Sequence, residues 1–298
     1  MRIGVTGVHG LVGSALVPFL RVNGNQPVPF VREVARGPEQ VPWNITSGVS
    51  DALRAEGLDA VIHLAGESVA GRWTDSRKAE ARRSRVEGTR RLCESLARLA
   101  RPPRILLSAS GVGIYGDRGG EVLLETSAAG SGFLADLSRD WEAATRPLAE
   151  AGARVVHLRF GMILSPAGGA LRKMLVPFRL GLGGKLGPGD QFMSWIALDD
   201  VLAATRFVLT ASLVGPVNFT APTPVTNADF ARALATALRR PALFPAPAFA
   251  LRLALGEMAD EMLLASQRAL PGRLQEAGYE FHYPRLDAAL RHLLTSAR

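Results

Sequence analysis

The sequence of 298 residues predicts an α/β protein in which helices cover both faces of a mainly parallel sheet. Three observations lead to this prediction. A short apolar strand at the N-terminus runs through evenly spaced glycines into a helical pattern. Short apolar strands then alternate with helical segments. After about residue 166 a stretch rich in glycine and proline leads into further helices, which predicts a smaller, mostly helical second part.

The N-terminal turn is the strongest functional signal. Strand Ile3 to Val5 is followed by Gly7, Gly10 and Gly13, and Ser14 to Val22 has apolar residues at helical spacing. The first glycine would allow a tight turn, the second would let the backbone approach a pyrophosphate, and the third would let helix pack on strand. The helix N-terminus would bind phosphates. A turn without a ligand can look similar, but this context favours a dinucleotide site in a Rossmann-type, doubly wound sheet.

The end of the second strand indicates which dinucleotide binds. A strand over 27–31 ends at Arg32, where Rossmann proteins meet the adenosine ribose. An arginine there can pair with the 2′-phosphate of NADP, and Arg36 lies close behind. An acid there favours NAD, so the neighbouring Glu33 keeps NAD(H) as the second choice. We therefore predict NADP(H) as the cofactor.

The remaining elements continue the alternation. We predict further strands over 41–45, 59–66, 104–110, 154–160 and 217–220, and helices over 49–56, 75–99, 133–150 and 199–209. For the smaller part we predict a short strand within 191–196, a helix capped by Thr226, and helices over 249–264 and 286–294. The predicted domains are an NADP-binding Rossmann domain over 1–166, completed by 196–221, and a cap region formed by 167–195 and 222–298.

Polar residues after the strands are candidates for a substrate site, because ligands of open α/β sheets bind beyond the carboxyl ends of the strands. Glu67, Arg72 and Trp73 follow the strand over 59–66. They could equally form a polar loop that the tryptophan anchors. His63, inside that strand, is predicted to be a hydrogen-bonded core residue.

The strand over 104–110 ends in hydroxyl groups. Ser110 and Tyr115 lie at this end, where a hydride-transfer enzyme would place its proton chemistry. The sequence therefore makes these two residues the candidates for catalysis.

The chain is basic, with a net charge of +8. Its densest arginine cluster lies between Arg82 and Arg104 and could be a nucleic-acid surface. However, Glu80, Glu87 and Glu94 alternate with the arginines, and no aromatic side chains are interspersed for base stacking. We interpret this segment as a solvated helix face and predict no nucleic-acid partner.

Other classes are excluded by composition. The single cysteine, Cys93, excludes an internal disulfide and a cysteine-based metal cluster, and its helical context predicts a buried, unreactive thiol; no metal site is predicted. No stretch of about eighteen apolar residues is long enough to span a membrane. The first strand begins at the N-terminus, which leaves no room for a signal peptide. We expect a cytoplasmic monomer or homodimer without a membrane partner.

Several motifs together resemble the extended short-chain dehydrogenase/reductases. They are Thr-Gly-x-x-Gly-x-x-Gly at 6–13, His-Leu-Ala-Gly at 63–66, Ser-Ala-Ser at 108–110, Tyr-Gly at 115–116 and Trp-Ile-x-x-Asp-Asp at 195–200. Longer stretches, such as Leu-Ala-Gly-Glu-Ser at 64–68 and Phe-Arg-Leu-Gly-Leu-Gly-Gly at 178–184, resemble one atypical branch. This is an epimerase-like group whose C-terminal domain has no known role. The resemblance implies an NADP(H)-binding Rossmann domain with a small-molecule substrate beneath the C-terminal part.

The resemblance and the placement of residues at strand ends together predict roles for individual positions. The cofactor would be contacted by Thr6, Gly7, Gly10, Leu11, Val12, Gly13, Arg32, Leu64, Ala65, Gly66, Ser108, Arg159 and Gly161. The substrate would be contacted by Glu67, Arg72, Trp73, Arg85, Lys173 and Trp195.

One departure from the family pattern concerns catalysis. The usual members have a Tyr-x-x-x-Lys pair, in which the lysine lowers the pKa of the tyrosine. None of the three tyrosines, Tyr115, Tyr279 and Tyr283, has a lysine four positions later. The helical asparagine of typical members is replaced by Arg85. We predict that Tyr115 and Ser110 substitute for the pair, with Arg85, Arg159 or Lys173 as electrostatic partner.

Two functions follow from these observations. The first is an NADP(H)-dependent oxidoreductase or epimerase that acts on a small polar substrate, which could be linked to a nucleotide. The second is a non-catalytic NADPH-binding sensor or regulatory protein, which the missing Tyr-x-x-x-Lys pair favours. The polar and aromatic candidates for a substrate site favour the enzyme.

Overall fold

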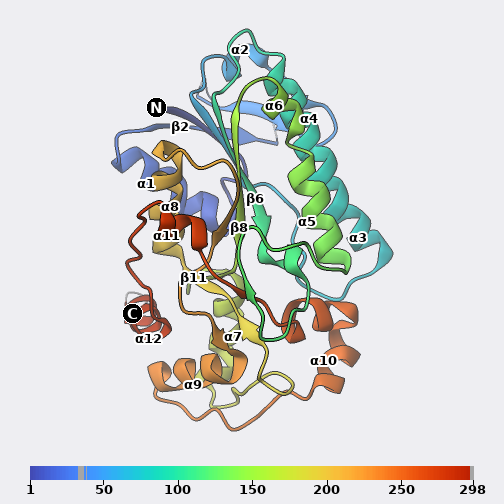
Figure 1. Cartoon of the computed structure of the whole chain (residues 1–298), viewed down its shortest axis with the longest axis vertical. Helices are drawn as coiled ribbons and strands as arrows, with labels where there is room; N and C mark the ends of the chain where they lie inside the picture. The colour runs from blue at the N-terminus through green and yellow to red at the C-terminus, as the bar shows by residue number, and fades with distance from the viewer. Residues whose placement is uncertain (33–36, 38, 296–298) are drawn as a thin grey trace.

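An eight-stranded sheet forms the centre of the molecule. The computed structural model describes residues 1–32, 37 and 39–295 (Figure 1). The order of the strands in the sheet is β12–β8–β6–β5–β1–β2–β3–β4, and all neighbours are parallel except β3 and β4. In chain order these strands are β1 (Arg2–Val5), β2 (Gln26–Val31), β3 (Val41–Asn44), β4 (Gly48–Val49), β5 (Ala60–His63), β6 (Ile105–Gly111), β8 (Arg154–Phe160) and β12 (Gly215–Phe219).

The direction in which strands are added to the sheet reverses at β1. The chain builds β2 and β3 on one side of β1 and then returns to place β5, β6, β8 and β12 on the other side. Such a reversal leaves a crevice at the carboxyl ends of β1 and β5, where Rossmann-like sheets bind their ligands. The predicted α/β class, with a mainly parallel Rossmann-like sheet, is therefore confirmed.

Helices cover both faces of the sheet, and the strand residues alternate between two apolar cores. Ile62 and Leu107 pack with α1 (Leu11–Val22) and α8 (Leu198–Thr210) on one face. Their neighbours Val61 and Leu106 pack on the opposite face with residues of α2 (Ala52–Ala55), α4 (Gly88–Ala97) and α6 (Arg146–Glu150). Continuous apolar runs such as these are expected in parallel strands that are buried on both sides.

Several helices differ from the sequence-based prediction. The segment 75–99 consists of α3 (Asp75–Arg82), a π-helical stretch over 83–87 called η1, and α4. The segment 133–150 is broken into α5 (Phe133–Ala143) and α6. The helix predicted over 49–56 is wrong in its first part, because residues 48–49 pair as β4 with β3 and only α2 is helical.

The cap contains an additional helix and a broken one. α7 (Gly169–Arg179) is absent from the prediction, because the glycines at its start and Pro177 near its end are typical of turns and loops rather than helices. The helix predicted over 249–264 ends at Gly256, whose φ is +63°, so that α10 (Ala248–Leu255) is followed by a separate π-helical stretch, η3 (Ala259–Leu264).

The C-terminal elements have their own apolar core at the lower end of the view in Figure 1. It joins α7, α9 (Asn227–Leu238) and α12 (Leu286–Thr295) to β9 (Met162–Leu164) and β11 (Trp195–Ala197), which pair in parallel. The remaining elements are an η2 turn over 112–115, α11 (Gly272–Glu276) and the short strands β7 (Val122–Leu123), β10 (Phe192–Met193), β13 (Val225–Thr226) and β14 (Arg268–Ala269). The predicted cap on α9 is confirmed, since the side chain of Thr226 accepts a hydrogen bond from the Asp229 N–H. The exact domain boundaries stay a prediction.

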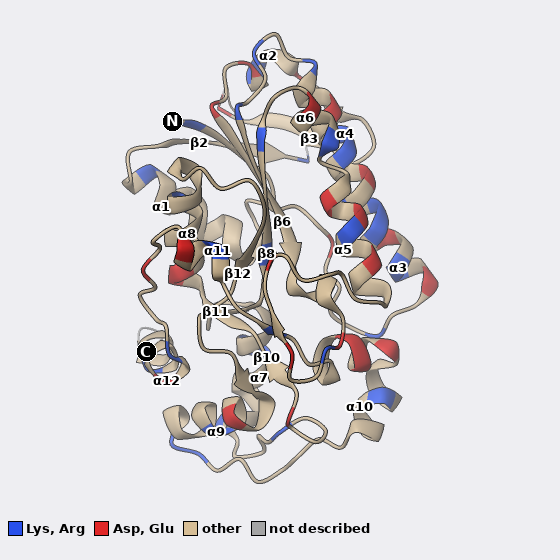
Figure 2. Cartoon of the chain, viewed as in Figure 1, with Lys and Arg blue, Asp and Glu red and all other residues tan. Residues whose placement is uncertain are grey.

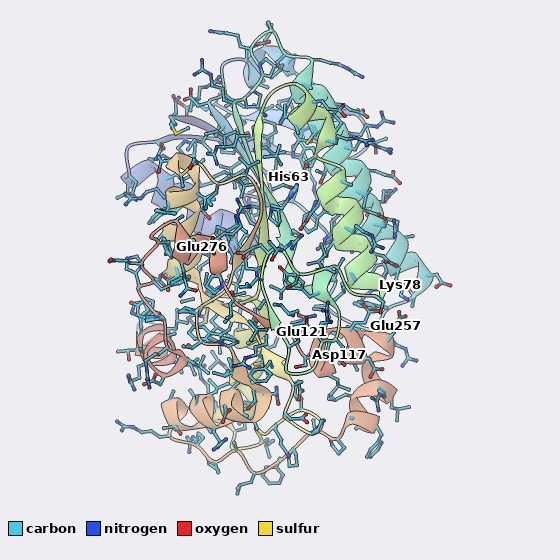
Figure 3. The ribbon with its side chains drawn as sticks, viewed as in Figure 1. His63, Lys78, Asp117, Glu121, Glu257 and Glu276 are labelled. Atoms are coloured by element: carbon cyan, nitrogen blue, oxygen red, sulfur yellow. The ribbon has the colours of Figure 1, made fainter. Side chains whose placement is uncertain are left out.

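The C-terminal part is fastened to the Rossmann-like part by polar contacts. Both oxygens of the Glu261 carboxylate accept hydrogen bonds, from the backbone N–H groups of Phe133 and Leu134, each at 2.8 Å. Glu261 therefore caps the N-terminus of α5 from η3, and an anion is favourable at this positive end of the helix dipole. Lys78 of α3 forms an ion pair with Glu257, and Figure 3 shows these two side chains meeting beside η3.

Charged residues of both signs alternate along α3 and α4 in Figure 2. Arg82 pairs with Asp140, and Arg91 pairs with Glu94. This pattern agrees with a solvated helix face; the absence of a nucleic-acid partner stays a prediction. In the described part of the chain, no helix is long and apolar enough to cross a membrane. The predicted burial of Cys93 is confirmed, and burial raises the pKa of its thiol to about 12.

Candidate functional site

The glycine turn after β1 is packed too tightly for any larger residue. Gly7 has a φ of +67°, and a Cβ atom there would lie 2.8 Å from the carbonyl oxygen of Leu64. A Cβ atom at Gly13 would lie only 2.2 Å from the carbonyl oxygen of Gly7. The turn therefore brings the backbone at the end of β5 against the start of α1.

The N-terminus of α1 is open to an anion. The helix begins at Leu11, its N-cap residue Gly10 provides no side-chain cap, and its first turn contains no acidic residue. The first N–H groups of a helix have no acceptor inside the helix, and the positive end of the dipole adds to their attraction for an anion. This arrangement fits a pyrophosphate, as the glycine spacing predicts.

A cavity of about 620 Å³ lies beside this turn. Its volume is in the range typical of small-molecule sites. The lining residues are Gly7, Val8, His9, Gly10, Phe30, Val31, Arg32, Gln40, Trp43, Leu64, Ala65 and Gly66. Apolar and aromatic residues from β2 and β3 thus form one side, and the glycine turn and the end of β5 form the other. The cavity could hold the adenosine half of a dinucleotide.

Arg32 lies at this cavity and forms an ion pair with Glu67. The distance from Arg32 Nη2 to Glu67 Oε1 is 3.0 Å, and the two side chains are 61% and 40% exposed. The predicted cofactor residue and the predicted substrate residue are therefore neighbours. The prediction of NADP over NAD also used Glu33 and Arg36. Both residues lie outside the described residues.

His63 is a hydrogen-bonded core residue, as predicted, and Figure 3 shows it inside the molecule. The Thr6 hydroxyl accepts hydrogen bonds from the N–H groups of Leu64 and Ala65, so its single proton is donated to His63 Nδ1, at 2.8 Å. The neutral ring then carries its proton on Nε2 and donates it to Thr89 Oγ1, also at 2.8 Å. Burial lowers the pKa of His63 to about 4, which agrees with a neutral ring.

The same network reaches Arg85. Trp141 Nε1 also donates to Thr89 Oγ1, at 2.9 Å, and the guanidinium of Arg85 lies 5.0 Å from the centre of the Trp141 ring. Arg85 Nη1 donates to the backbone oxygen of Glu67 at 2.8 Å. Burial lowers the pKa of Arg85 to about 10, which the Glu67 carboxylate opposes. Arg85 thus supports the loop after β5 that borders the cavity.

The predicted catalytic residues belong to a second, buried network. Arg159 forms a bidentate ion pair with Glu142, with N–O distances of 2.8 and 2.9 Å, and Ser110 donates to the same carboxylate at 2.7 Å. Tyr115 donates to Asn218 Oδ1 at 2.8 Å and accepts from Arg159 Nη1 at 3.0 Å. The hydrogen bonds from Arg159 hold the pKa of Glu142 below its usual range despite burial.

This geometry does not favour Tyr115 as a proton donor. The side chain has no exposed surface, and its hydroxyl uses both its donor and an acceptor position within the protein. Burial raises the pKa of Tyr115, although Arg159 and Asn218 oppose the shift. A lowered pKa is what the usual tyrosine of these enzymes needs. The catalytic role of Tyr115 and Ser110 stays a prediction.

Of two neighbouring predicted substrate residues, Arg72 contacts the cap and Trp73 packs against α5. Arg72 Nη1 donates to the backbone oxygen of Leu253 in α10 at 2.8 Å. Trp73 donates to the Val69 backbone oxygen at 2.8 Å, and its ring meets Phe133 edge-on at 5.0 Å. Trp73 therefore anchors its loop, which agrees with the second interpretation of the sequence, a polar loop held in place by the tryptophan.

The other predicted site residues are not brought together with these. Trp195 has no exposed surface, and its indole N–H donates to the Thr223 backbone oxygen at 3.0 Å. Lys173 is exposed on α7. Ser108 is fully buried, and its hydroxyl has no hydrogen-bond partner within the described chain. A Cβ atom at Gly161 would lie 2.6 Å from the Ser194 oxygen, so this glycine permits the close packing of β9 and β11.

Sequence reasoning did not identify several residues of the two networks and the cavity. Trp43 and Phe30 line the cavity, and the predicted third strand could have indicated Trp43, because that strand lies next to β2 in a Rossmann order. No local signal indicates that Glu142 would pair with Arg159 or that Asn218 would contact Tyr115. Among the described residues, no group of three or more His, Cys, Asp or Glu side chains could hold a metal ion.

Comparisons with known proteins agree with this geometry. The chain is 43% identical over 295 residues to an epimerase family protein of Mycobacterium tuberculosis, with 98% of this chain and 97% of the relative covered. It is 35% identical to the human epimerase family protein SDR39U1, with 99% of this chain and 100% of the relative covered.

Two solved structures of epimerase proteins have a similar fold. The crystal structure of human SDR39U1 (isoform 2) with NADPH has a TM-score of 0.90, 34% sequence identity and 99% coverage of both chains. The nucleoside-diphosphate sugar epimerase from Corynebacterium glutamicum has a TM-score of 0.82 and 36% identity; the match covers 99% of this chain and 58% of that one.

The family models match two separate segments. Residues 246–293 match a domain of unknown function, DUF1731. Residues 3–219, which include the glycine turn and all eight strands of the central sheet, match the NAD-dependent epimerase/dehydratase family. The chain therefore belongs to the NAD-dependent epimerase/dehydratase family.

Proposed function

We propose that this protein binds NADP(H) and uses it in an oxidoreductase or epimerase reaction on a small polar substrate. The observation that carries the proposal is the cavity beside the glycine turn, which is lined both by Arg32 and by Gly10, the N-cap residue at the open N-terminus of α1. The arginine would pair with the 2′-phosphate, and the helix N-terminus would bind the pyrophosphate. The crystallisation of human SDR39U1 with NADPH supports this choice of cofactor.

The residues around the cavity fit such a cofactor. Gly7 packs against the backbone after β5 and Gly13 packs against Gly7, which keeps the turn tight. Gly10 lines the cavity, where its lack of a side chain would let the backbone approach a pyrophosphate. The Thr6 hydroxyl and His63 hold the backbone of residues 64–65 in place along the cavity. When bound, the nicotinamide would supply or accept a hydride.

Binding is tested by calorimetric titration of the purified protein with NADPH and NADH. We expect tighter binding of NADPH, and a loss of that preference in Arg32→Ala. Arg90→Ala is the matched control, since Arg90 is an exposed arginine on α4, away from the cavity. Failure of both dinucleotides to bind, or an unchanged preference in Arg32→Ala, would contradict the proposal.

A second candidate function is non-catalytic NADPH sensing. It is favoured by the saturated hydroxyl of Tyr115 and by the absence of a Tyr-x-x-x-Lys pair. Two assays distinguish the enzyme from the sensor. In the first, the protein is incubated with NADPH and a panel of carbonyl compounds, and oxidation of NADPH is measured. In the second, it is incubated with nucleotide sugars, and their conversion is followed by NMR. Turnover of any member supports the enzyme, whereas NADPH binding without turnover across the panel supports the sensor.

A further inference from the structure

Exposed apolar side chains gather at the end of the cap. Two short segments, 172–189 and 239–256, contain half of the large apolar residues that are exposed in the described chain. These residues are Val176, Leu180, Leu182, Leu243, Phe244, Phe249 and Leu253, each at least 54% exposed. Scattered exposed apolar residues are ordinary, but such clustering marks an interaction surface. We call the exposed residues of these two segments the cap-end surface.

The two segments lie side by side. Leu182 and Ala242 form an isolated β-bridge, and the Phe244 N–H donates to the Gly183 oxygen at 3.1 Å. Gly184 packs so closely that a Cβ atom there would lie 2.2 Å from the Phe244 oxygen. In Figure 1 the connection from α9 to α10 forms the lower end of the molecule, opposite α2. The connection between α9 and α10 is therefore at the far end of the molecule from α2, whereas Leu253 of α10 contacts Arg72 on the loop after β5.

The two segments are basic. They contain Arg172, Lys173, Arg179, Lys185, Arg239, Arg240 and Arg252, and no aspartate or glutamate, although the exposed Asp190 and Glu257 follow them directly. Glu257 pairs with Lys78 of α3. Arg252 pairs with Asp260 of η3. Lys173, Arg179, Arg239 and Arg240 form no ion pair among the described residues, which leaves their charges available to an anionic partner. Figure 2 shows basic residues and no acidic ones along the connection from α9 to α10.

The excess of basic residues favours an anionic occupant. A second copy of the chain, meeting this surface through a two-fold axis, would bring two mainly basic surfaces together. An anionic bilayer instead presents phosphates above apolar acyl chains, the combination that protruding leucine and phenylalanine side chains with surrounding arginines can contact together.

We propose that the cap-end surface docks the protein on an anionic phospholipid bilayer. The leucine and phenylalanine side chains enter the headgroup region, while the unpaired basic side chains contact lipid phosphates. The docking is peripheral, because none of the described helices could span the bilayer. It departs from the sequence-based expectation of no membrane partner, which considered spanning segments. It does not depend on the proposed function.

The test is sedimentation of the full chain with lipid vesicles of two compositions. One consists of phosphatidylcholine alone, and in the other about a third of the phosphatidylcholine is replaced by anionic phosphatidylglycerol. We expect binding to the anionic vesicles only, and weaker binding as salt is raised from about 0.1 M to about 0.5 M. Absence of binding to the anionic vesicles, or equal binding to both compositions, would overturn the proposal.

Matched variants assign the binding to this surface. Phe244→Glu should weaken vesicle binding by about tenfold or more, whereas Leu53→Glu, at an 86% exposed position on α2, should not. Likewise Arg179→Glu with Arg240→Glu should weaken binding far more than Arg90→Glu with Arg98→Glu, which changes the net charge equally on α4 and at its C-cap.

Equal loss in the control variants would show a non-specific charge effect and overturn the assignment. A second outcome would also overturn the proposal. If the native chain does not bind vesicles and Phe244→Glu changes the oligomeric state, as measured by light scattering, the surface is a contact between protein molecules instead. NADPH affinity is measured in every variant. Unchanged affinity shows that the variants fold, and absent NADPH binding in the native chain would contradict only the proposed function.

Discussion

The ion pair between Arg32 and Glu67 makes a sharp prediction about cofactor affinity. Arg32 Nη2 lies 3.0 Å from Glu67 Oε1. A 2′-phosphate that pairs with Arg32 would therefore compete with this carboxylate for the guanidinium. We expect Glu67→Gln to bind NADPH more tightly, because the competing negative charge is removed while the shape of the side chain is kept.

The size of the effect follows from the exposure of the pair. With side chains that are 61% and 40% exposed, the ion pair contributes little, on the order of 0.5–1 kcal/mol. Since about 1.4 kcal/mol corresponds to a factor of ten, the Kd for NADPH should fall about two- to fivefold. The Kd for NADH should change less, because NADH lacks the 2′-phosphate that would compete with the carboxylate for Arg32.

The assay is a calorimetric titration with NADPH and NADH at low and moderate salt. In an Arg32→Ala background, the Glu67→Gln substitution should have almost no further effect on NADPH affinity, which completes a double-mutant cycle. Weaker NADPH binding in Glu67→Gln would refute the reasoning and would indicate instead that the carboxylate contacts the bound cofactor.

Three further predictions concern the core of the site. Because burial lowers the pKa of His63 to about 4, the unfolded chain binds a proton that the folded chain rejects, so stability falls as the pH drops from about 7 towards 4. At pH 5 the loss should be about 2 kcal/mol relative to neutral pH, and urea unfolding of His63→Gln should lack this part of the pH dependence. Tyr115→Phe should lower the free energy of unfolding by about 1–3 kcal/mol, since it leaves two buried partners unsatisfied, yet NADPH titration should give an unchanged Kd. A changed Kd or lost turnover would restore Tyr115 to the site. Gly13→Ala places a Cβ atom 2.2 Å from a carbonyl oxygen and should weaken NADPH binding by more than about tenfold, whereas Gly120→Ala, with nothing within 4 Å, should leave the same titration unchanged.

The sequence could predict what local periodicity determines. The strand over 154–160 has the bounds that its apolar pattern indicates, and the Thr226 cap is present as its sequence signature predicts. The glycine turn lies between a strand and a helix, as its spacing predicts, because the strand, the turn and the helix are adjacent in the sequence.

Contacts between distant segments could not be predicted. Tyr115 follows a strand end that suggests a catalytic position, but Asn218, which is 103 residues later, covers its hydroxyl. Arg72 follows another strand end and contacts a helix residue 181 positions away. Position at a strand end predicts nearness to a ligand only when no later segment occupies that space, and a single sequence does not contain this information.

The carboxylate of Glu261 at the N-terminus of α5 has a consequence for folding cooperativity. Its two hydrogen bonds link residues separated by more than 120 positions and join the segments that match the two family models. A Cβ atom at Gly132 would lie 2.9 Å from Glu261 Oε1, so the approach depends on that glycine. Without the C-terminal segment, α5 would lose its anion and two backbone N–H groups would lose their acceptor, at a cost of about 1–3 kcal/mol for each one that stays buried. The two segments are therefore thermodynamically coupled, and the chain should unfold in one transition rather than two.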